Sequence, residues 1–177
     1  MKKLVNNISI RFAFGNIARD RHVLLVIKDH NGDYLLGEKP DFYPTGICRL
    51  VGGGIEKDEA PLDAAIREAR EELTIAITEK NLKPVAQVIT NAKLDTNNLN
   101  NTTFIYLLTG IDDLKLQPND DIKALKKFSK KDLAELIEKY NNLDDKNLYF
   151  GEDGYKHYWN DYGKMYFFIH QVVLDLT

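Results

Sequence analysis

Short apolar runs bounded by turn-forming residues predict β-strands in the first half and the middle of the chain. The first run is rich in β-branched residues. An Asp-His-Asn-Gly-Asp turn and a second apolar run follow it, which together predict a hairpin. Asparagine is abundant in residues 91–101, between the last two runs, and this segment is predicted to be a loop. The predicted strands are residues 22–28, 34–37, 84–90 and 102–109.

Strong helix-forming residues predict a helix over residues 59–73. Asp58 is the expected N-cap, and Pro61 lies in the first turn, where its missing N–H group costs little. On a helical projection, the apolar residues of this segment form a narrow stripe that should face the core. The stripe contains Leu62, Ala65, Ile66, Ala69 and Leu73.

Helical periodicity predicts a second helix over residues 129–140, where Ser129 and Asp132 resemble a capping box. The apolar tail, residues 165–176, fits a helix, although its periodicity does not exclude a strand. Because helices interrupt the strands without a regular strand–helix–strand alternation, the pattern predicts an α/β (α+β) fold. This fold has a mixed sheet with helices packed on it.

Composition places the chain among soluble proteins of one domain. Its 177 residues predict a single domain spanning residues 1–177. The net charge of −3 argues against a nucleic-acid-binding protein, and no apolar run is long enough to span a membrane. The single cysteine, Cys48, excludes an internal disulfide and is expected to be a small buried apolar residue of a cytoplasmic protein. A homodimer is left open.

The predicted helix at residues 59–73 carries three carboxylates on one face, roughly opposite its apolar stripe. Glu68, Glu71 and Glu72 repel one another at this spacing, and they lie in the C-terminal half, where the helix dipole disfavours anions. A divalent cation such as Mg²⁺ or Mn²⁺ would turn this conflict into a favourable interaction, since hard cations prefer oxygen ligands. The alternative is an ordinary solvated helix face.

The residues around this helix resemble the Nudix box, G-x5-E-x7-R-E-U-x-E-E-x-G-U, in which U is a bulky aliphatic residue. Two positions depart from that pattern. Ala69 is smaller than the usual aliphatic residue, and Thr74 replaces the final glycine, so the exit from the helix is expected to differ here. The matching charged and glycine positions are Gly53, Glu59, Arg67, Glu68, Glu71 and Glu72.

The resemblance implies a Nudix-type mixed β-sheet sandwiched between helices, and a metal-dependent hydrolase. Its substrate would be a nucleoside diphosphate linked to another group, a small molecule whose pyrophosphate bond is cleaved. The metal ligands and catalytic residues would be Glu68, Glu71 and Glu72, assisted by the carbonyl group of Gly53. Glu59 and Arg67 would form an ion pair that supports the box. The general base would be Glu71, Glu72 or a loop acid, for which Asp120 and Asp121 are candidates unless they merely form a turn.

Contacts with substrate are less clearly indicated. Phe42, Tyr43 and Arg49 precede the box and are candidates for binding a base or a phosphate, with loop packing as the alternative. Residues 157–159 (His-Tyr-Trp) could form an aromatic wall of the site, or they could belong to the core. The competing function is a Nudix-like nucleotide or sugar sensor that binds without cleaving. We favour the hydrolase because all three box glutamates are present.

Overall fold

The computed structural model describes residues 1–39, 44–119, 122–151 and 154–177. Within these residues, six strands form one mixed sheet in the order β1-β4-β5-β2-β3-β6. The pairs β1–β4 and β2–β5 are parallel, and the other neighbours are antiparallel. The strands of this sheet are β1 (Lys2–Ser9), β2 (Arg21–Lys28), β3 (Tyr34–Glu38), β4 (Leu82–Lys93), β5 (Asn98–Leu108) and β6 (Ala124–Phe128).

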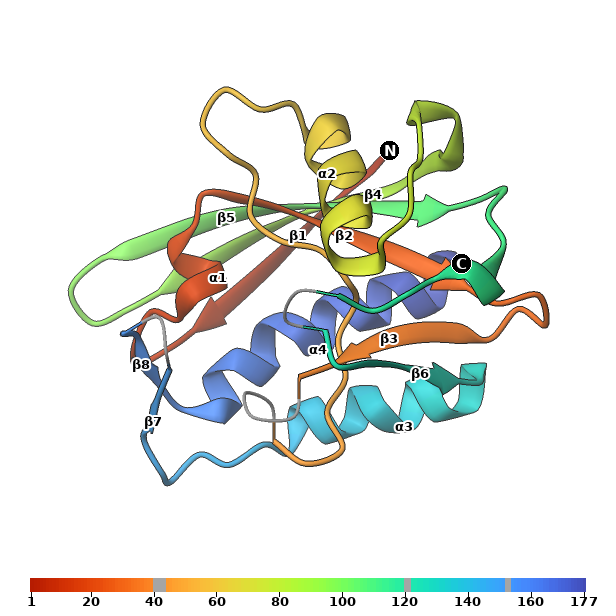
Figure 1. The fold of residues 1–177 in the computed structure, drawn as a ribbon. Coiled ribbons are helices and arrows are strands. Elements are labelled where there is room, and N and C mark those ends of the chain that lie inside the picture. Colours follow the sequence, from red (N-terminus) through yellow and green to blue (C-terminus); the bar gives the residue numbers. More distant parts are fainter. Residues whose placement is uncertain (40–43, 120–121, 152–153) are drawn as a thin grey trace.

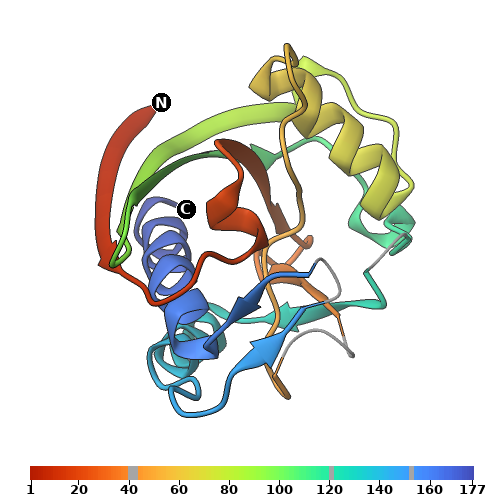
Figure 2. The same ribbon diagram turned by 90° about the vertical axis from the view of Figure 1, so that its left-hand side faces the viewer.

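Helices cover both faces of this sheet, as predicted (Figure 1). On one face, α2 packs over Val23, Leu25 and Ile27 of β2, and on the other face α3 and α4 pack over Leu24 and Val26. Because β2 is buried on both faces, its sequence is a continuous apolar run. Figure 2 shows the sheet curving around α4. The main helices are α2 (Pro61–Leu73), α3 (Lys130–Asn141) and α4 (Trp159–Leu176).

The smaller elements connect these layers. A helical turn, α1 (Gly15–Ala18), precedes β2, and two 3₁₀ turns, η1 (Glu79–Asn81) and η2 (Asp113–Lys115), precede β4 and follow β5. A short hairpin, β7 (Tyr149–Phe150) and β8 (Lys156–His157), leads into α4.

A glycine-containing segment before α2 lies between β2 and β3 where these two strands diverge. The N–H groups of Val23 and Leu25 donate to the carbonyl groups of Gly53 and Val51 at 2.9 and 2.8 Å. On the opposite side, Gly37 and Arg49 exchange two backbone hydrogen bonds. The segment is therefore bonded into the sheet and forms a rigid support beneath the helix that follows.

The four predicted strands are all present, but the prediction of a loop over residues 91–101 is wrong. β4 continues to Lys93 and β5 begins at Asn98. Here the asparagine side chains form specific hydrogen bonds that offset their poor strand propensity. Asn91 donates to the side chain of Asn7 at 2.9 Å, and the buried Asn101 donates to two backbone carbonyl groups of the segment that contains α1.

The predicted helices are present with corrected boundaries. In α2 the N-cap is Ala60, not Asp58, and it makes no side-chain capping bond, while Pro61 occupies the first helical turn as expected. The capping box at Ser129 and Asp132 is confirmed. The C-terminal tail is helical, and α4 begins at Trp159, before the predicted start.

Three of the residues for which the sequence suggested a packing role are buried in the interior. Cys48 is buried, and burial raises the pKa of its thiol to about 11. His157 and Trp159 are also buried and pack against Tyr149 and Tyr162, which places them in the core. In the part of the chain that the structure describes, no helix has the length and apolar character needed to cross a membrane.

Candidate functional site

Helix α2 buries two of its three predicted ligands. Glu68 and Glu72 are only 7% and 5% exposed, whereas the side chain of Glu71 is 44% exposed. The expectation of an acidic face opposite the apolar stripe is therefore wrong for Glu68 and Glu72. The buried face extends to these two glutamates because residues 52–54 cover them. Its other members are Ala64, Ala65, Ala69 and Leu73.

Residues 52–54, called the glycine segment below, contact the two buried carboxylates at different glycines. The N–H group of Gly52 donates to Glu72 Oε2 at 2.7 Å. Gly53 lies against Glu68 so closely that a Cβ atom at this position would be 2.8 Å from the carboxylate carbon Cδ. Any larger residue at this position would push the Glu68 carboxylate away from its place beside Arg67.

Arg67 connects the helix to the loop that leads into it. Its Nε donates to Glu59 Oε1 at 3.0 Å and its Nη2 donates to Glu59 Oε2 at 3.0 Å, which forms the expected ion pair. Nη1 donates to Glu68 at 2.7 Å and to Glu71 at 3.0 Å, and Nη2 also donates to the carbonyl of Gly54 at 2.8 Å. One guanidinium thus holds three carboxylates and the loop in a fixed arrangement.

Burial and ion pairing shift the pKa values of this cluster in opposite directions. Burial raises the pKa of Glu72 to about 6 and also raises the pKa of Glu68. Hydrogen bonding from Arg67 lowers the pKa of Glu59, and the same pairing raises the pKa of Arg67. Holding two desolvated carboxylates this close together therefore favours a ligand that supplies positive charge.

The donor set fits a hard divalent cation. In each of the three glutamates, one carboxylate oxygen accepts the hydrogen bond from Gly52 or Arg67 described above. Among the described residues no hydrogen bond reaches the other oxygen of Glu68, Glu71 or Glu72. The carbonyl of Gly53 accepts a hydrogen bond from Val23 and so has one lone pair left. Carboxylate and carbonyl oxygens are the ligands that Mg²⁺ and Mn²⁺ prefer.

A distant segment caps the C-terminal end of α2. The backbone N–H groups of Gln117 and Asn119 donate to the carbonyl groups of Leu73 and Glu72 at 3.1 and 2.9 Å. The side chain of Asn119 donates to the carbonyl of Glu71 at 3.2 Å. Sequence reasoning missed Asn119, because a contact with backbone carbonyl groups leaves no pattern of residue types in the helix.

The expected change in the helix exit does not occur. Thr74 adopts the left-handed conformation with φ of 53° and ψ of 35°, and its N–H group donates to the carbonyl of Ala69. This is the geometry that glycine usually provides at the end of a helix. The chain therefore leaves the helix as it would with glycine at this position, and the β-branched Thr74 carries the backbone strain.

Of the three residues predicted to bind substrate, the structure describes only Arg49. Arg49 is buried at 8% exposure, and its Nη1 donates to the hydroxyl of Tyr166 in α4 at 2.8 Å. Its charge also lies close enough to Glu72 to lower the pKa of that carboxyl group, opposing the effect of burial. Phe42, Tyr43, Asp120 and Asp121 lie outside the described residues.

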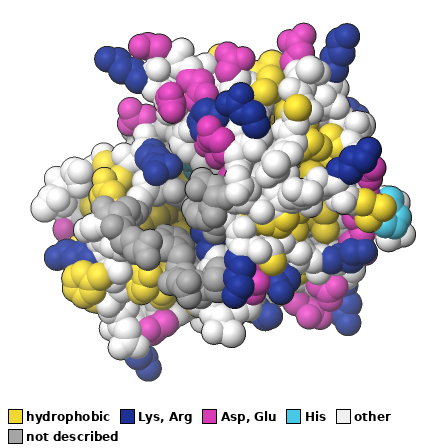
Figure 3. All heavy atoms as spheres, viewed as in Figure 1, with side chains coloured by type: hydrophobic (Ala, Val, Ile, Leu, Met, Phe, Trp, Pro, Cys, Tyr) yellow, Lys and Arg dark blue, Asp and Glu magenta, His cyan; other side chains and the backbone are white. Residues whose placement is uncertain are grey.

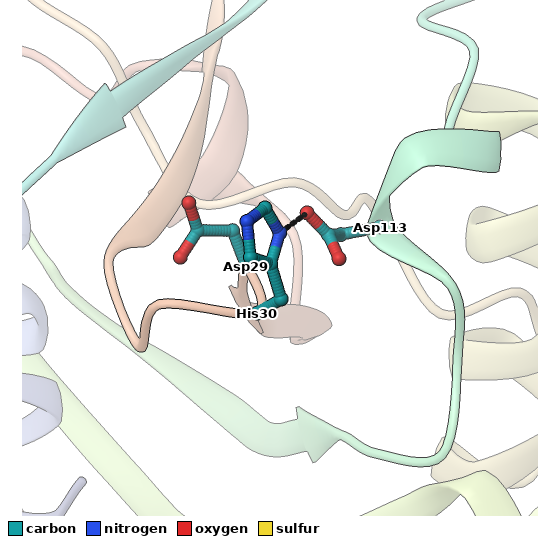
Figure 4. A group of neighbouring side chains, drawn as sticks. All are labelled: Asp29, His30 and Asp113. Carbon is teal, nitrogen blue, oxygen red and sulfur yellow. Dashed lines mark hydrogen bonds and ion pairs between the residues drawn. The ribbon is translucent and has the colours of Figure 1, made fainter.

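A second group of titratable side chains is formed by Asp29 and His30 in the turn between β2 and β3 and by Asp113 of η2 (Figure 4). Potential ligand atoms of Asp29, His30 and Asp113 lie within 4.8 Å of one another, and His30 pairs with Asp113 at 3.1 Å. Asp29 accepts hydrogen bonds from the N–H groups of Asn31 and Asp33 and pairs with Lys127. The hydrogen bond from Lys127 lowers the pKa of Asp29 to about 2. These partners explain the group as the anchor of a turn.

Acidic and basic side chains also gather at the surface over α2, as the space-filling view shows (Figure 3). This face therefore carries charges of both signs. The charges of this face are consistent with the box, in which Arg67 pairs with Glu59, Glu68 and Glu71.

Comparisons with solved structures support the same fold. The chain is 20% identical to the E. coli dihydroneopterin triphosphate pyrophosphohydrolase, with a TM-score of 0.51 over 68% of this chain and 85% of that chain. It is 23% identical to the E. coli ORF135 protein, with a TM-score of 0.50 over 68% and 80% of the two chains. A Nudix hydrolase from M. smegmatis, RenU, is 20% identical, with a TM-score of 0.50 over 71% and 81%.

Sequence comparison identifies the family directly. No curated protein matches the chain. The family model of the NUDIX domain, however, matches residues 18–149, which is more than half of the chain and includes the glycine segment, all of α2 and the segment that caps it. Together with the mixed sheet between helices, this match shows that the chain belongs to the Nudix family.

Proposed function

We propose that this protein is a metal-dependent pyrophosphohydrolase acting on a nucleoside diphosphate linked to another group. The observation that carries the proposal is the set of contacts that holds Glu68 and Glu71 on Arg67 and Glu72 on Gly52, and that leaves one carboxylate oxygen of each without a hydrogen bond from a described residue. We further propose that residues 1–177 act as one domain, since β1 pairs with β4 and α4 shares a core with α3.

Glu68, Glu71 and Glu72 would hold Mg²⁺ or Mn²⁺, and the carbonyl of Gly53 would contribute its remaining lone pair. When bound, the cation supplies positive charge that offsets the repulsion between a nucleophile and the phosphate oxygens, and it lowers the pKa of water. Arg67 and Glu59 keep the helix and loop in register, so they act on the reaction only through the carboxylates they position.

A carboxylate of α2 could also accept the proton of the attacking water. Glu71 is the more exposed of the two candidates and so is more accessible to a water molecule, while Glu72 is buried and bonded to Gly52. The loop acids Asp120 and Asp121 stay candidates for this role. A general base of this kind typically contributes about 10²–10⁴-fold to a rate.

The test is a substrate panel of nucleotide sugars, ADP-ribose, dinucleoside polyphosphates and nucleoside triphosphates, each assayed with Mg²⁺ and with Mn²⁺. Glu71→Gln and Glu72→Gln should each lower kcat by about 10²–10⁴-fold, because each removes a charged ligand or the base. Glu135→Gln is the matched control, since Glu135 is an exposed glutamate of α3 that should leave kcat unchanged. A chelator should abolish turnover by the unmodified protein.

Unchanged metal-dependent turnover in both α2 variants would contradict the assignment of the site. The sensor alternative makes a different prediction, namely binding of a nucleotide or sugar with no cleavage of any panel member.

A further inference from the structure

An arginine outside the box lies directly on its glycine segment. Arg19 follows α1, and its side chain crosses Gly54. A Cβ atom on Gly54 would lie 2.8 Å from Nη1 of Arg19, 3.2 Å from its Cδ and 3.4 Å from its Cζ. Only the lack of a side chain at Gly54 therefore allows the guanidinium to occupy this position.

The backbone of Arg19 is fixed by a buried polar network. The side chain of Asn101, which is fully buried in β5, donates to the carbonyl of Arg19 at 2.7 Å and to that of Asn16 at 3.0 Å. Thr103 donates to the Oδ1 atom of Asn101 at 3.2 Å and so holds the amide in this orientation. The buried network thus places Arg19 against the glycine segment from the sheet.

Two guanidinium groups meet at Gly54, and they differ in their partners. Arg67 donates to the Gly54 carbonyl and is shared among three carboxylates. Arg19 is exposed, and its guanidinium makes no hydrogen bond or ion pair with any residue in the described part of the chain. Arg19 is therefore a cation beside Gly54 that pairs with no carboxylate of the described residues.

The glycine segment brings this free cation close to the proposed ligands. Gly52 contacts Glu72, Gly53 contacts Glu68 and Gly54 contacts Arg19, and successive Cα atoms are about 3.8 Å apart. Because these three residues carry no side chains, no side chain of this segment stands between the guanidinium and the carboxylates. A diphosphate that approached the carboxylates would be repelled by them and attracted by Arg19.

We propose that Arg19 binds a phosphate group of the substrate and determines affinity for the diphosphate, an inference that rests on the proposed function. A guanidinium presents paired N–H donors that match two oxygens of one phosphate group. Arg19 would bind the phosphate equally well in the ground state and in the transition state. Its loss therefore raises KM and changes kcat much less.

The first experiment compares Arg19→Ala with Arg70→Ala. Both variants remove one positive charge, and Arg70 is an exposed residue of α2 at a position where the box pattern allows any residue. Arg19→Ala should raise KM by about 10- to 100-fold, the loss expected for a charge-assisted hydrogen-bonded pair, with kcat changed far less. Arg70→Ala should leave both constants unchanged, and Arg19→Lys should fall between Arg19→Ala and the unmodified protein.

The second experiment displaces Arg19 without changing it. Gly54→Ala adds a methyl group where the guanidinium now lies, so the flexible side chain must move away. This variant should raise KM in the unmodified background and have little further effect in the Arg19→Ala background. Additive effects of the two substitutions would show that Gly54 and Arg19 act separately, which contradicts the proposal.

Binding measurements separate this proposal from the proposed hydrolase activity. Calorimetry with ADP and Mg²⁺ needs no turnover, and Arg19→Ala should weaken ADP binding by the same factor as its KM while Arg70→Ala does not. Equal ADP affinity in the unmodified protein and Arg19→Ala overturns the role of Arg19, as does the absence of ADP binding by the unmodified protein. ADP binding that depends on Arg19, with no hydrolysis of any panel member, overturns the hydrolase proposal alone.

Discussion

Single residues of the box tolerate unusual environments because neighbouring groups compensate for them. Glu68 and Glu72 are buried carboxylates, and each is stabilised by an N–H donor from Arg67 or Gly52. Thr74 is different, because nothing in its left-handed conformation requires a β-branched side chain.

Thr74→Gly should therefore stabilise the protein. For a residue other than glycine, the left-handed conformation costs roughly 1–2 kcal/mol, and the greater freedom of glycine in the unfolded chain returns about 0.4–1 kcal/mol of this. We expect a net gain of about 0.5–1 kcal/mol in the free energy of unfolding, measured by urea denaturation. Thr96→Gly, in an exposed turn where φ is not positive, should give no gain. A loss of stability in Thr74→Gly would contradict this explanation.

The proposed ligand residues could be chosen from the sequence, but their environments could not be predicted. Spacing places Glu68, Glu71 and Glu72 on one face of a helix, and the resemblance to the Nudix box implies the pairing of Glu59 with Arg67, which the structure contains. Whether a helix face is solvated depends on what packs against it, and residues 52–54 come from outside the helix. The contact between Arg49 and Tyr166 likewise joins residues 117 positions apart.

At the scale of secondary structure, α2 depends on a segment far along the chain for its C-terminal cap. Asn119 bonds the carbonyl of Glu71 through its side chain and that of Glu72 through its backbone. These carbonyl groups belong to two of the proposed metal ligands, so the cap holds the backbone from which both side chains extend.

Asn119→Ala should lower both stability and activity. Loss of one hydrogen bond to a helix carbonyl should reduce the free energy of unfolding by about 1 kcal/mol. The matched control is Asn142→Ala, since the side chain of Asn142 donates to the carbonyl of Glu138 at 2.8 Å near the end of α3. The two variants should lose similar stability, but only Asn119→Ala should lower kcat. An equal effect on kcat in both would show that the cap has no positioning role.

Elements with a strong apolar pattern were predictable, and edge strands were not. β2, β3 and α3 each carry a buried apolar pattern that is evident in the sequence. β1 and β6 lie at the two edges of the sheet and are largely exposed, so their sequences contain many polar and charged residues. Their place in the sheet follows from pairing with β4 and β3, which no local pattern encodes.

At the scale of the whole molecule, two buried histidines make stability depend on pH. Burial lowers the pKa of His22 to about 3 and that of His170 to about 4, whereas the unfolded values are near 6.5. The unfolded chain therefore binds protons at a higher pH than the folded chain. The contribution of each histidine to stability is complete above about pH 6.5 and is lost as the pH falls toward its folded pKa.

We expect the free energy of unfolding to fall below pH 6.5 with a slope of up to about 1.4 kcal/mol per pH unit for each histidine. Glu72 opposes this, since its raised pKa of about 6 gives stability as the pH falls. Urea denaturation between pH 7.5 and pH 5 should therefore show a shallower slope for His170→Gln than for the unmodified protein. Equal slopes would show that His170 does not titrate on unfolding.

The insertion of the glycine segment between β2 and β3 limits how this protein can vary. Each position of the segment has its own neighbour, since Gly53 meets a helix carboxylate while Gly54 meets a guanidinium. Adding or deleting one residue here would move each position to the wrong neighbour and break the backbone bonding to both flanking strands. Change in this segment is therefore restricted to substitutions that preserve its length.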